Sequence, residues 1–207
     1  MNNIVIEDES NVVISNLESN TYNIGKKSLV KINLDNNKYE NMTFNLEENA
    51  YLIINKMYNE KEINEEITIN LNGINSKIDY NFSTKVYNNQ KYVININHNN
   101  KNTISNVINH GVVMNDSHLF FEVNSSIKKG NNKSKLNQES KIIVMSKNNS
   151  VIKPNLFIDE YDVDAVHSAT IGKFNKNEIF YLMTKGITKE ESVNLLIKGF
   201  LEAHIRR

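Results

Sequence analysis

The chain has 207 residues, with 24 basic and 24 acidic side chains and a formal net charge of zero. A balanced charge gives no long-range attraction for nucleic acid or for an anionic membrane, so we expect neither as a partner. The sequence contains no cysteine, which excludes disulfides, thiolate metal sites and cysteine nucleophiles within this chain.

The N-terminal residues 1–8 lack the basic and apolar regions of a secretory signal, and no apolar run approaches the ~20 residues that span a bilayer. We therefore expect a cytoplasmic protein without a membrane segment. About one residue in five is asparagine. AT-rich codon usage explains this more simply than a functional asparagine ladder, although asparagine also tolerates the left-handed conformation that tight corners need.

From residue 1 to about residue 160, the apolar residues recur in short alternating runs. Alternation of this kind, rich in β-branched and aromatic residues, predicts half-buried strands. The clearest runs are residues 12–14, 29–34, 51–54, 67–71, 92–97, 119–123 and 142–145. Polar breakers separate them at residues 35–37, 88–90, 99–102 and 128–132.

Strands at this spacing, without helices between them, fit two mainly β architectures. One is an antiparallel sandwich, and the other is a parallel β-helix in which each coil stacks on the last. Asn72-Gly73 is the one hairpin-type Asn-Gly pair, which slightly weakens the sandwich. Because no sharp internal repeat is present, the pattern alone leaves both architectures open.

Two helices are expected near the C-terminus. Asn175 can cap the first helix, with Glu178 completing a capping box and Gly186 ending the helix in a left-handed conformation. Thr188 and Glu191 form a second box that opens the next helix. The apolar stripes at helical spacing are Ile179, Phe180, Leu182 and Met183, then Val193, Leu196, Ile197, Phe200 and Leu201.

These helices have two interpretations. They either cover an open end of the β structure or present a groove or ridge to a partner, and the pattern favours neither. The basic pair Arg206-Arg207 follows the second helix, where positive charge suits the helix dipole.

Six short motifs follow one another in residues 153–200. They are Lys153-Pro154, Asp162-Val163, His167-Ser168-Ala169-Thr170-Ile171-Gly172, Phe180-Tyr181-Leu182, Lys185-Gly186-Ile187 and Gly199-Phe200. In this order they resemble the C-terminal half of the SufB/SufD family of iron–sulfur cluster assembly proteins. Weaker similarity extends upstream to Asn97-His98, Asn102-Thr103 and residues 111–113. SufB-type chains carry Glu-His-Glu-Ala-Thr at residues 166–170, so this chain is more similar to SufD.

The resemblance implies a right-handed parallel β-helix with a short C-terminal helical hairpin. We therefore expect a shortened β-helix core at residues 1–172 and a C-terminal helical domain at residues 173–207. The family is a non-enzymatic scaffold in which SufB and SufD pair through their β-helices and their C-terminal helices dock an ABC-type ATPase, SufC. The expected partners are thus a SufC-type ATPase and either a SufB-type subunit or a second copy of this chain.

His167 is, by this resemblance, expected to bind iron or an iron–sulfur cluster at the subunit interface through a neutral imidazole nitrogen. The alternative is a structural histidine that hydrogen-bonds the neighbouring acidic turn. The resemblance places the cluster-holding cysteine on SufB, and this chain has no cysteine. We therefore expect no tightly bound cofactor, only a transient cluster shared with a partner. Ser168 replaces the usual glycine of the motif and constrains the backbone beside the histidine.

Two other groups of residues resemble metal sites at first sight. The acidic cluster comprises Asp159, Glu160, Asp162 and Asp164. Its spacing lacks the glycine and the terminal glutamate of a calcium loop, so a solvated or capping turn is expected. Three scattered histidines are His98, His110 and His118. They approach one another only if their strands stack, and surface or core-filling roles are more common for such residues than metal binding.

The resemblance assigns ATPase docking to the helical hairpin. The candidate residues are Phe180, Tyr181, Lys185, Gly186, Ile187, Glu190, Glu191 and Phe200. Most of the apolar candidates are equally suited to packing against the β-helix. The polar-flanked turn at residues 185–187 is therefore the better contact candidate.

Two other functions remain open beside the SufD-like scaffold. A β-helix hydrolase, lyase or acyltransferase needs clustered carboxylates or a catalytic histidine, and we find neither paired acidic residues on successive coils nor a strict hexapeptide repeat. A passive interaction module without ligands is the third possibility.

Overall fold

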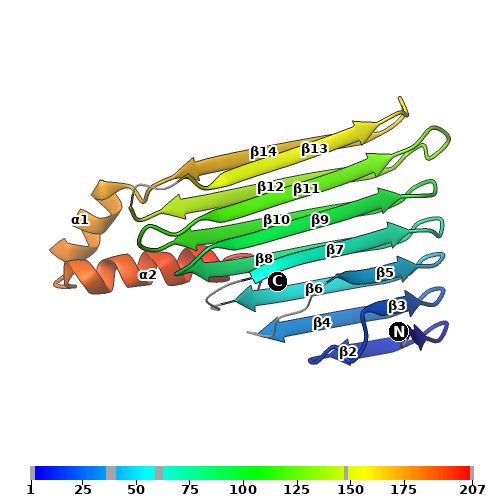
Figure 1. Ribbon diagram of the computed structural model, residues 1–207, viewed down its shortest axis with the longest axis horizontal. Coiled ribbons are helices and arrows are strands. Elements are labelled where there is room, and N and C mark those ends of the chain that lie inside the picture. The colour runs from blue at the N-terminus through cyan, green and yellow to red at the C-terminus, as the bar shows by residue number, and fades with distance from the viewer. Residues whose placement is uncertain (1–2, 36–40, 59–62, 147–148, 206–207) are drawn as a thin grey trace.

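The computed structural model describes residues 3–35, 41–58, 63–146 and 149–205, which form fourteen strands and two helices (Figure 1). The strands are β1 (Asn3–Ile6), β2 (Asn11–Ile14), β3 (Thr21–Ile24), β4 (Leu29–Asp35), β5 (Met42–Leu46), β6 (Tyr51–Tyr58), β7 (Ile63–Leu71), β8 (Lys77–Val86), β9 (Gln90–His98), β10 (Ile104–Val113), β11 (Leu119–Ile127), β12 (Lys135–Val144), β13 (Val151–Ile158) and β14 (Asp164–Gly172). The helices are α1 (Lys176–Thr184) and α2 (Lys189–Glu202).

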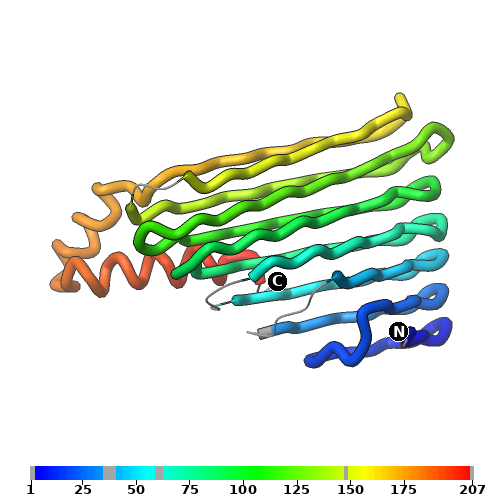
Figure 2. Tube along the Cα trace, viewed as in Figure 1, coloured from blue at the N-terminus to red at the C-terminus, as the bar shows by residue number. Residues whose placement is uncertain are grey.

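The strands alternate between two seven-stranded parallel sheets. Odd-numbered strands form sheet A, in the order β1-β3-β5-β7-β9-β11-β13, and even-numbered strands form sheet B. Each coil therefore stacks on the previous one, as the Cα trace shows (Figure 2). The parallel β-helix that the C-terminal motifs imply is confirmed, and the antiparallel sandwich is excluded. The division into two domains after residue 172 stays a prediction.

Period-two alternation decides which side chains fill the interior. In β7, Ile67 and Ile69 are buried, whereas Thr68 between them is only half-buried. Paired residues of parallel strands point to the same side, so Ile69 lies in a row between Phe44 of β5 and Ile96 of β9. Burying one such side chain contributes about 1.5–3 kcal/mol, and these interior rows hold adjacent coils together.

Asparagine takes the place of glycine at several corners of the coils. Asn49, Asn75 and Asn102 lie in successive corners and have φ values of 58°, 61° and 58°. Asparagine adopts this left-handed conformation more readily than most residues. The expectation that asparagine serves at corners is confirmed at these three positions.

Asparagine side chains also form ladders along the stack. The longest runs through Asn23, Asn45, Asn70 and Asn97, in which each side-chain amide N–H donates to Oδ1 of the preceding asparagine at 2.8 Å. Shorter ladders join Asn33, Asn55 and Asn81, and Asn95, Asn124 and Asn155. The asparagine ladder, which composition alone made the less favoured interpretation, is therefore a real feature of the fold.

Both helices begin at the predicted caps. Asn175 accepts a hydrogen bond from the Asn177 N–H at 2.9 Å, and not through the expected box with Glu178. The Asn175 side chain forms a local turn with the backbone N–H two residues later, so its oxygen has a hydrogen-bond donor without any contribution from Glu178. Thr188 and Glu191 form the complete capping box at the start of α2.

The two helices differ in how they contact the β-helix. Helix α2 lies on the outer face of sheet B over β8 and β10, and its Ile197 and Leu201 are buried against Val112. Helix α1 contacts α2 and has no buried residue. The helices therefore leave the open end of the stack uncovered, while one covers a sheet face and the other remains exposed.

Two predicted features, the Arg206-Arg207 tail and the breaker at residues 36–37, lie outside the described residues. Within the described part of the chain, no helix is long and apolar enough to cross a membrane.

Candidate functional site

The last coil, formed by β13 and β14, leaves one end of the stack open. Each of these strands lies at the edge of its sheet and pairs on one side only. Its inward-facing apolar residues have no further coil above them, and Ile158 and Ile171 are exposed. A long edge strand with exposed apolar side chains is a surface that pairs readily with another strand.

His167 lies in the middle of this open end. It is the partner of Gln138 in the parallel register, and the Gln138 side chain is buried inside the β-helix, where it donates to Ser125 Oγ at 2.7 Å. His167 therefore faces the same inward side, but it is exposed because no coil covers it. Among the described residues, its side chain forms no hydrogen bond or ion pair, including any to the acidic turn. The imidazole is thus accessible from outside the β-helix.

The acidic turn before β14 is organised by one carboxylate. Glu160 accepts hydrogen bonds from the N–H groups of Gly130 at 2.7 Å and Tyr161 at 2.9 Å. These bonds, the Gly130 bond above all, lower the pKa of Glu160 below its usual value. Of the two expected roles, a solvated turn or a helix cap, the structure shows the solvated turn, since the segment connects β13 to β14 and no described helix begins there. In the described ranges, no group of three or more His, Asp or Glu side chains is arranged to hold a metal ion.

The three scattered histidines do not come together. His98 is buried within a corner and bonds Thr103 Oγ1 at 2.7 Å and Ser105 Oγ at 2.8 Å. Burial lowers the pKa of His98 to about 4. His118 is exposed in the connection just before β11, while His110 lies beneath α2. The three histidines thus lie in separate surroundings, as expected for surface and core-filling residues.

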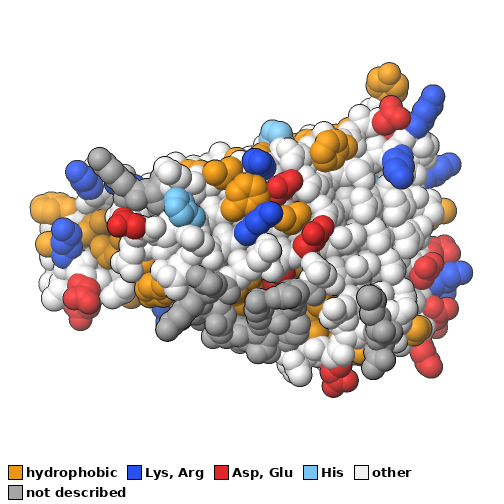
Figure 3. Space-filling view, in the orientation of Figure 1, with side chains coloured by type: hydrophobic (Ala, Val, Ile, Leu, Met, Phe, Trp, Pro, Cys, Tyr) orange, Lys and Arg blue, Asp and Glu red, His pale blue; other side chains and the backbone are white. Residues whose placement is uncertain are grey.

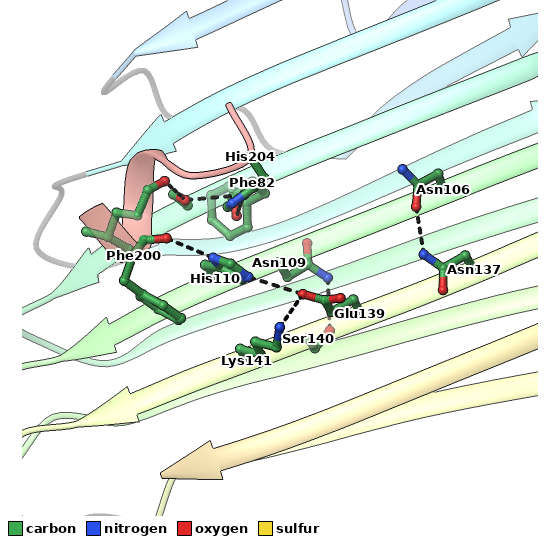
Figure 4. A network of polar contacts seen from close by, with 12 residues as sticks. Phe82, Asn106, Asn109, His110, Asn137, Glu139, Ser140, Lys141, Phe200 and His204 are labelled. Atoms are coloured by element: carbon green, nitrogen blue, oxygen red, sulfur yellow. Dashed lines mark hydrogen bonds and ion pairs between the residues drawn. The ribbon is translucent and has the colours of Figure 1, made fainter. Parts of the chain in front are cut away.

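His110 fastens α2 to sheet B (Figure 4). Its ring stacks on Phe200 with centroids 4.3 Å apart, and its Nδ1–H donates to the Phe200 carbonyl at 2.9 Å. Its Nε2 lies 3.5 Å from Glu139, which also forms an ion pair with Lys141 at 2.7 Å. Burial lowers the pKa of His110 despite the Phe200 and Glu139 contacts that act in the opposite direction.

A second histidine, His204, adds to the contacts between α2 and sheet B. His204 Nε2–H donates to the Phe82 carbonyl at 3.1 Å, and the Ser83 hydroxyl donates to the Leu201 carbonyl at 2.6 Å. The His110 and His204 rings contact each other edge to face at 4.2 Å. Sequence analysis did not single out His204. The signal was its position four residues after Phe200, on the apolar stripe of the helix.

The turn between the helices keeps its polar character. Gly186 has φ +84°, and an added Cβ there would meet no atom within 4 Å. Lys185 places its ammonium 5.2 Å from the centre of the Tyr181 ring. Glu190 is exposed and Ile187 is half-buried. The predicted docking residues at this turn are thus accessible.

Two predicted docking residues are occupied within the chain. Glu191 is engaged in the α2 capping box, and Phe200 packs between His110 and Phe174. By contrast, Phe180 and Tyr181 of α1 are 68% and 61% exposed. Hydrophobic side chains are visible among charged ones at this helical end of the molecule (Figure 3).

A buried ion pair was missed by sequence analysis. Lys56 of β6 pairs with Glu65 of β7 inside the β-helix, and Glu65 also accepts from the Tyr58 hydroxyl at 3.0 Å. Burial lowers the pKa of Lys56 well below its usual value. The sequence feature that could have revealed it is the position of Lys56 in the alternating pattern. Lys56 lies midway between the buried Ile54 and Tyr58, where an inward-facing apolar residue is expected.

The comparison with known families covers nearly the whole chain. A model described as the SUF system FeS cluster assembly, SufBD core domain, matches residues 1–200. The chain belongs to the SufBD family. The match includes the coils from β1 onward, so the SufBD relationship extends well upstream of the motifs in residues 153–200.

Individual SufBD relatives align over shorter stretches. The iron–sulfur cluster assembly protein SufD of Bacillus subtilis is 38% identical over 96 residues, which cover 46% of this chain and 22% of that protein. A SufBD family protein of Mycobacterium bovis is 29% identical over 102 residues, or 49% of this chain and 12% of that protein. The aligned part therefore spans less than a quarter of either relative.

Proposed function

We propose that this SufBD chain is a non-catalytic, SufD-like cytoplasmic subunit that docks a SufC-type ABC ATPase on its C-terminal helices. The observation that carries the proposal is helix α1, which has no buried residue and exposes Phe180, Tyr181 and Met183. Exposed apolar residues gathered on one short helix are typical of a protein interaction site. The SufBD relationship suggests the kind of partner.

Co-purification with the ATPase tests the docking proposal. The Phe180→Ala/Tyr181→Ala double variant should lose at least tenfold in affinity, because aromatic side chains at the centre of an interface contribute most to binding. Val5→Ala is a matched control, since Val5 is 69% exposed on β1, away from the helices. Wild-type protein that retains no ATPase would refute docking.

The open end supports a second part of the proposal, which is pairing with a SufB-type subunit or with a second copy. Edge strands β13 and β14 supply unpaired backbone groups, and Ile158 and Ile171 supply apolar contact. His167 would then lie at the interface, where its imidazole adds a ligand to a cluster held by the partner's thiolates. The cluster is a transient substrate of the assembly and not a resident cofactor of this chain.

The His167 role is tested in the complex with a cysteine-containing SufB-type partner. His167→Ala should reduce cluster formation, followed by visible absorbance, without changing the free energy of unfolding. His118→Ala is the control, because His118 is also exposed but precedes β11, one coil before the last, and is not on β14. If His167→Ala assembles clusters at the wild-type rate, the ligand role is wrong.

A further inference from the structure

A groove lies between α1, the segment that leads into it, and the end of β12. It encloses about 570 Å³. Its floor is apolar and includes Met145 after β12, Phe174 before α1, and Ile179 and Met183 of α1. Phe174 and Ile179 are half-buried, so the side chains that line the groove are themselves packed against the rest of the protein.

Three lysines surround the apolar floor. Lys173 comes from the connecting segment, Lys176 from the first turn of α1 and Lys189 from the first turn of α2. All three are exposed, and none forms an ion pair with another described residue. No acidic side chain is among the described residues that line the groove. The described lining of the groove therefore carries positive charge and no negative charge.

The positions of two of these lysines work against local stability. Lys176 and Lys189 are the first residues of their helices, where the partial positive charge of the helix end favours an acidic side chain. Glu178 in the first turn of α1, and Glu190 and Glu191 in that of α2, offset this repulsion in part, but neither lysine forms an ion pair with another described residue. Because they are exposed and unpaired within the described chain, both lysines remain available to the carboxylates of an external partner.

We propose that this groove receives an apolar side chain from an acidic segment of the docked ATPase, with Lys173, Lys176 and Lys189 pairing with carboxylates on either side of it. The inference rests on the proposed ATPase docking and assigns its anchor point. An apolar residue fills the floor, which supplies affinity, and the surrounding ion pairs supply orientation and a faster association rate. The lysine-ringed groove, and not only the turn at residues 185–187, is then the principal contact.

Charge reversal tests this assignment by titration calorimetry with the full ATPase. The triple variant K173E/K176E/K189E should bind at least tenfold more weakly than wild type, and its affinity should no longer fall as salt concentration rises. K173Q/K176Q/K189Q should show a smaller loss in the same direction. The matched control K77E/K101E/K128E reverses three exposed lysines at the corners of the coils and should stay within twofold of wild type.

The outcomes separate the groove from docking as a whole. If wild type binds the ATPase and K173E/K176E/K189E binds equally well, the groove assignment is overturned and ATPase docking stands. If wild type does not bind at all, both fall. If the variant keeps its ATPase affinity but turns a dimer into a monomer, or loses binding to phosphatidylglycerol vesicles, the groove holds a second copy or a lipid, and the assignment is likewise overturned.

Discussion

At the residue scale, the most consequential side chains are charged or titratable groups inside the β-helix. Lys56 and Glu65 form an ion pair in the interior, beside the aromatic rings of Tyr58, Phe82 and Tyr92. A buried pair of this kind contributes little net stability compared with apolar residues, yet each member depends on the other.

Removal of one partner is therefore expected to be far more harmful than removal of both. Lys56→Met leaves Glu65 buried without its counter-charge and should lower the free energy of unfolding by about 3–5 kcal/mol. The double variant Lys56→Met/Glu65→Leu should recover most of this loss. Urea denaturation of both variants measures the difference, and equal destabilisation by the single and double variants would contradict the interpretation.

His98 makes the fold sensitive to pH. Its folded pKa is about 4, against 6.5 for an ordinary histidine, so the unfolded chain binds more protons between these values. The free energy of unfolding should therefore fall as pH drops from 6.5 toward 4, by about 3 kcal/mol at about 1.4 kcal/mol per pKa unit. Denaturant titrations across this range measure the slope.

His98→Gln removes the titrating group and should flatten this part of the pH profile, although it lowers stability at neutral pH. His118→Gln changes an exposed histidine and should keep the wild-type profile. A wild-type profile that is flat between pH 6.5 and pH 4 would show that the His98 ring is not held neutral by the fold.

At the element scale, the helical hairpin depends on its end residues. Gly186 ends α1 with φ +84°, a conformation that a Cβ strains, whereas Gly199 lies within α2 where an added Cβ meets nothing within 4 Å. Gly186→Ala should thus destabilise the protein by about 1 kcal/mol. Gly199→Ala should stabilise it by up to about 1 kcal/mol, because alanine favours a helix interior. Thermal unfolding of the two variants checks the opposite signs.

The elements differ in how far the sequence predicts them. Apart from the Asn175–Glu178 box, which does not form, the ends of the hairpin helices were predictable, because Asn175, Gly186 and the Thr188–Glu191 box are local signals. The strands were predictable as strands, but their parallel order was not, because the choice of neighbour depends on contacts between residues from 18 to 31 positions apart. The resemblance of residues 153–200 supplied that order.

The candidate site was less predictable than the fold. His167 could be singled out from its motif, but only the strand order shows that it faces the uncovered interior at the last coil. Phe200 had the pattern of an apolar stripe, which does not reveal that it stacks on His110 from β10. The groove joins Met145 to α1 across the β13–β14 coil, so no local pattern contains it.

At the scale of the whole molecule, the open end makes association the expected state. Ile158→Lys/Ile171→Lys places two charges on the uncovered face of the last coil and should convert the associated protein to monomer, seen by sedimentation velocity. Val5→Lys, on the outer side of β1, should leave the association unchanged. The role of this end would be contradicted if the wild-type protein is monomeric alone and also forms no complex when it is mixed with a SufB-type partner.

The asparagine ladders have a mechanical consequence. Each coil is held to the next by backbone hydrogen bonds and by side-chain hydrogen bonds, such as the one that the Asn70 amide donates to Asn45, and both sets run along the stack. The stack therefore behaves as a stiff rod, and α2 is attached to its side at β8 and β10. A force applied to the hairpin is then expected to tilt the whole stack as one body and to move its open end without separating one coil from the next.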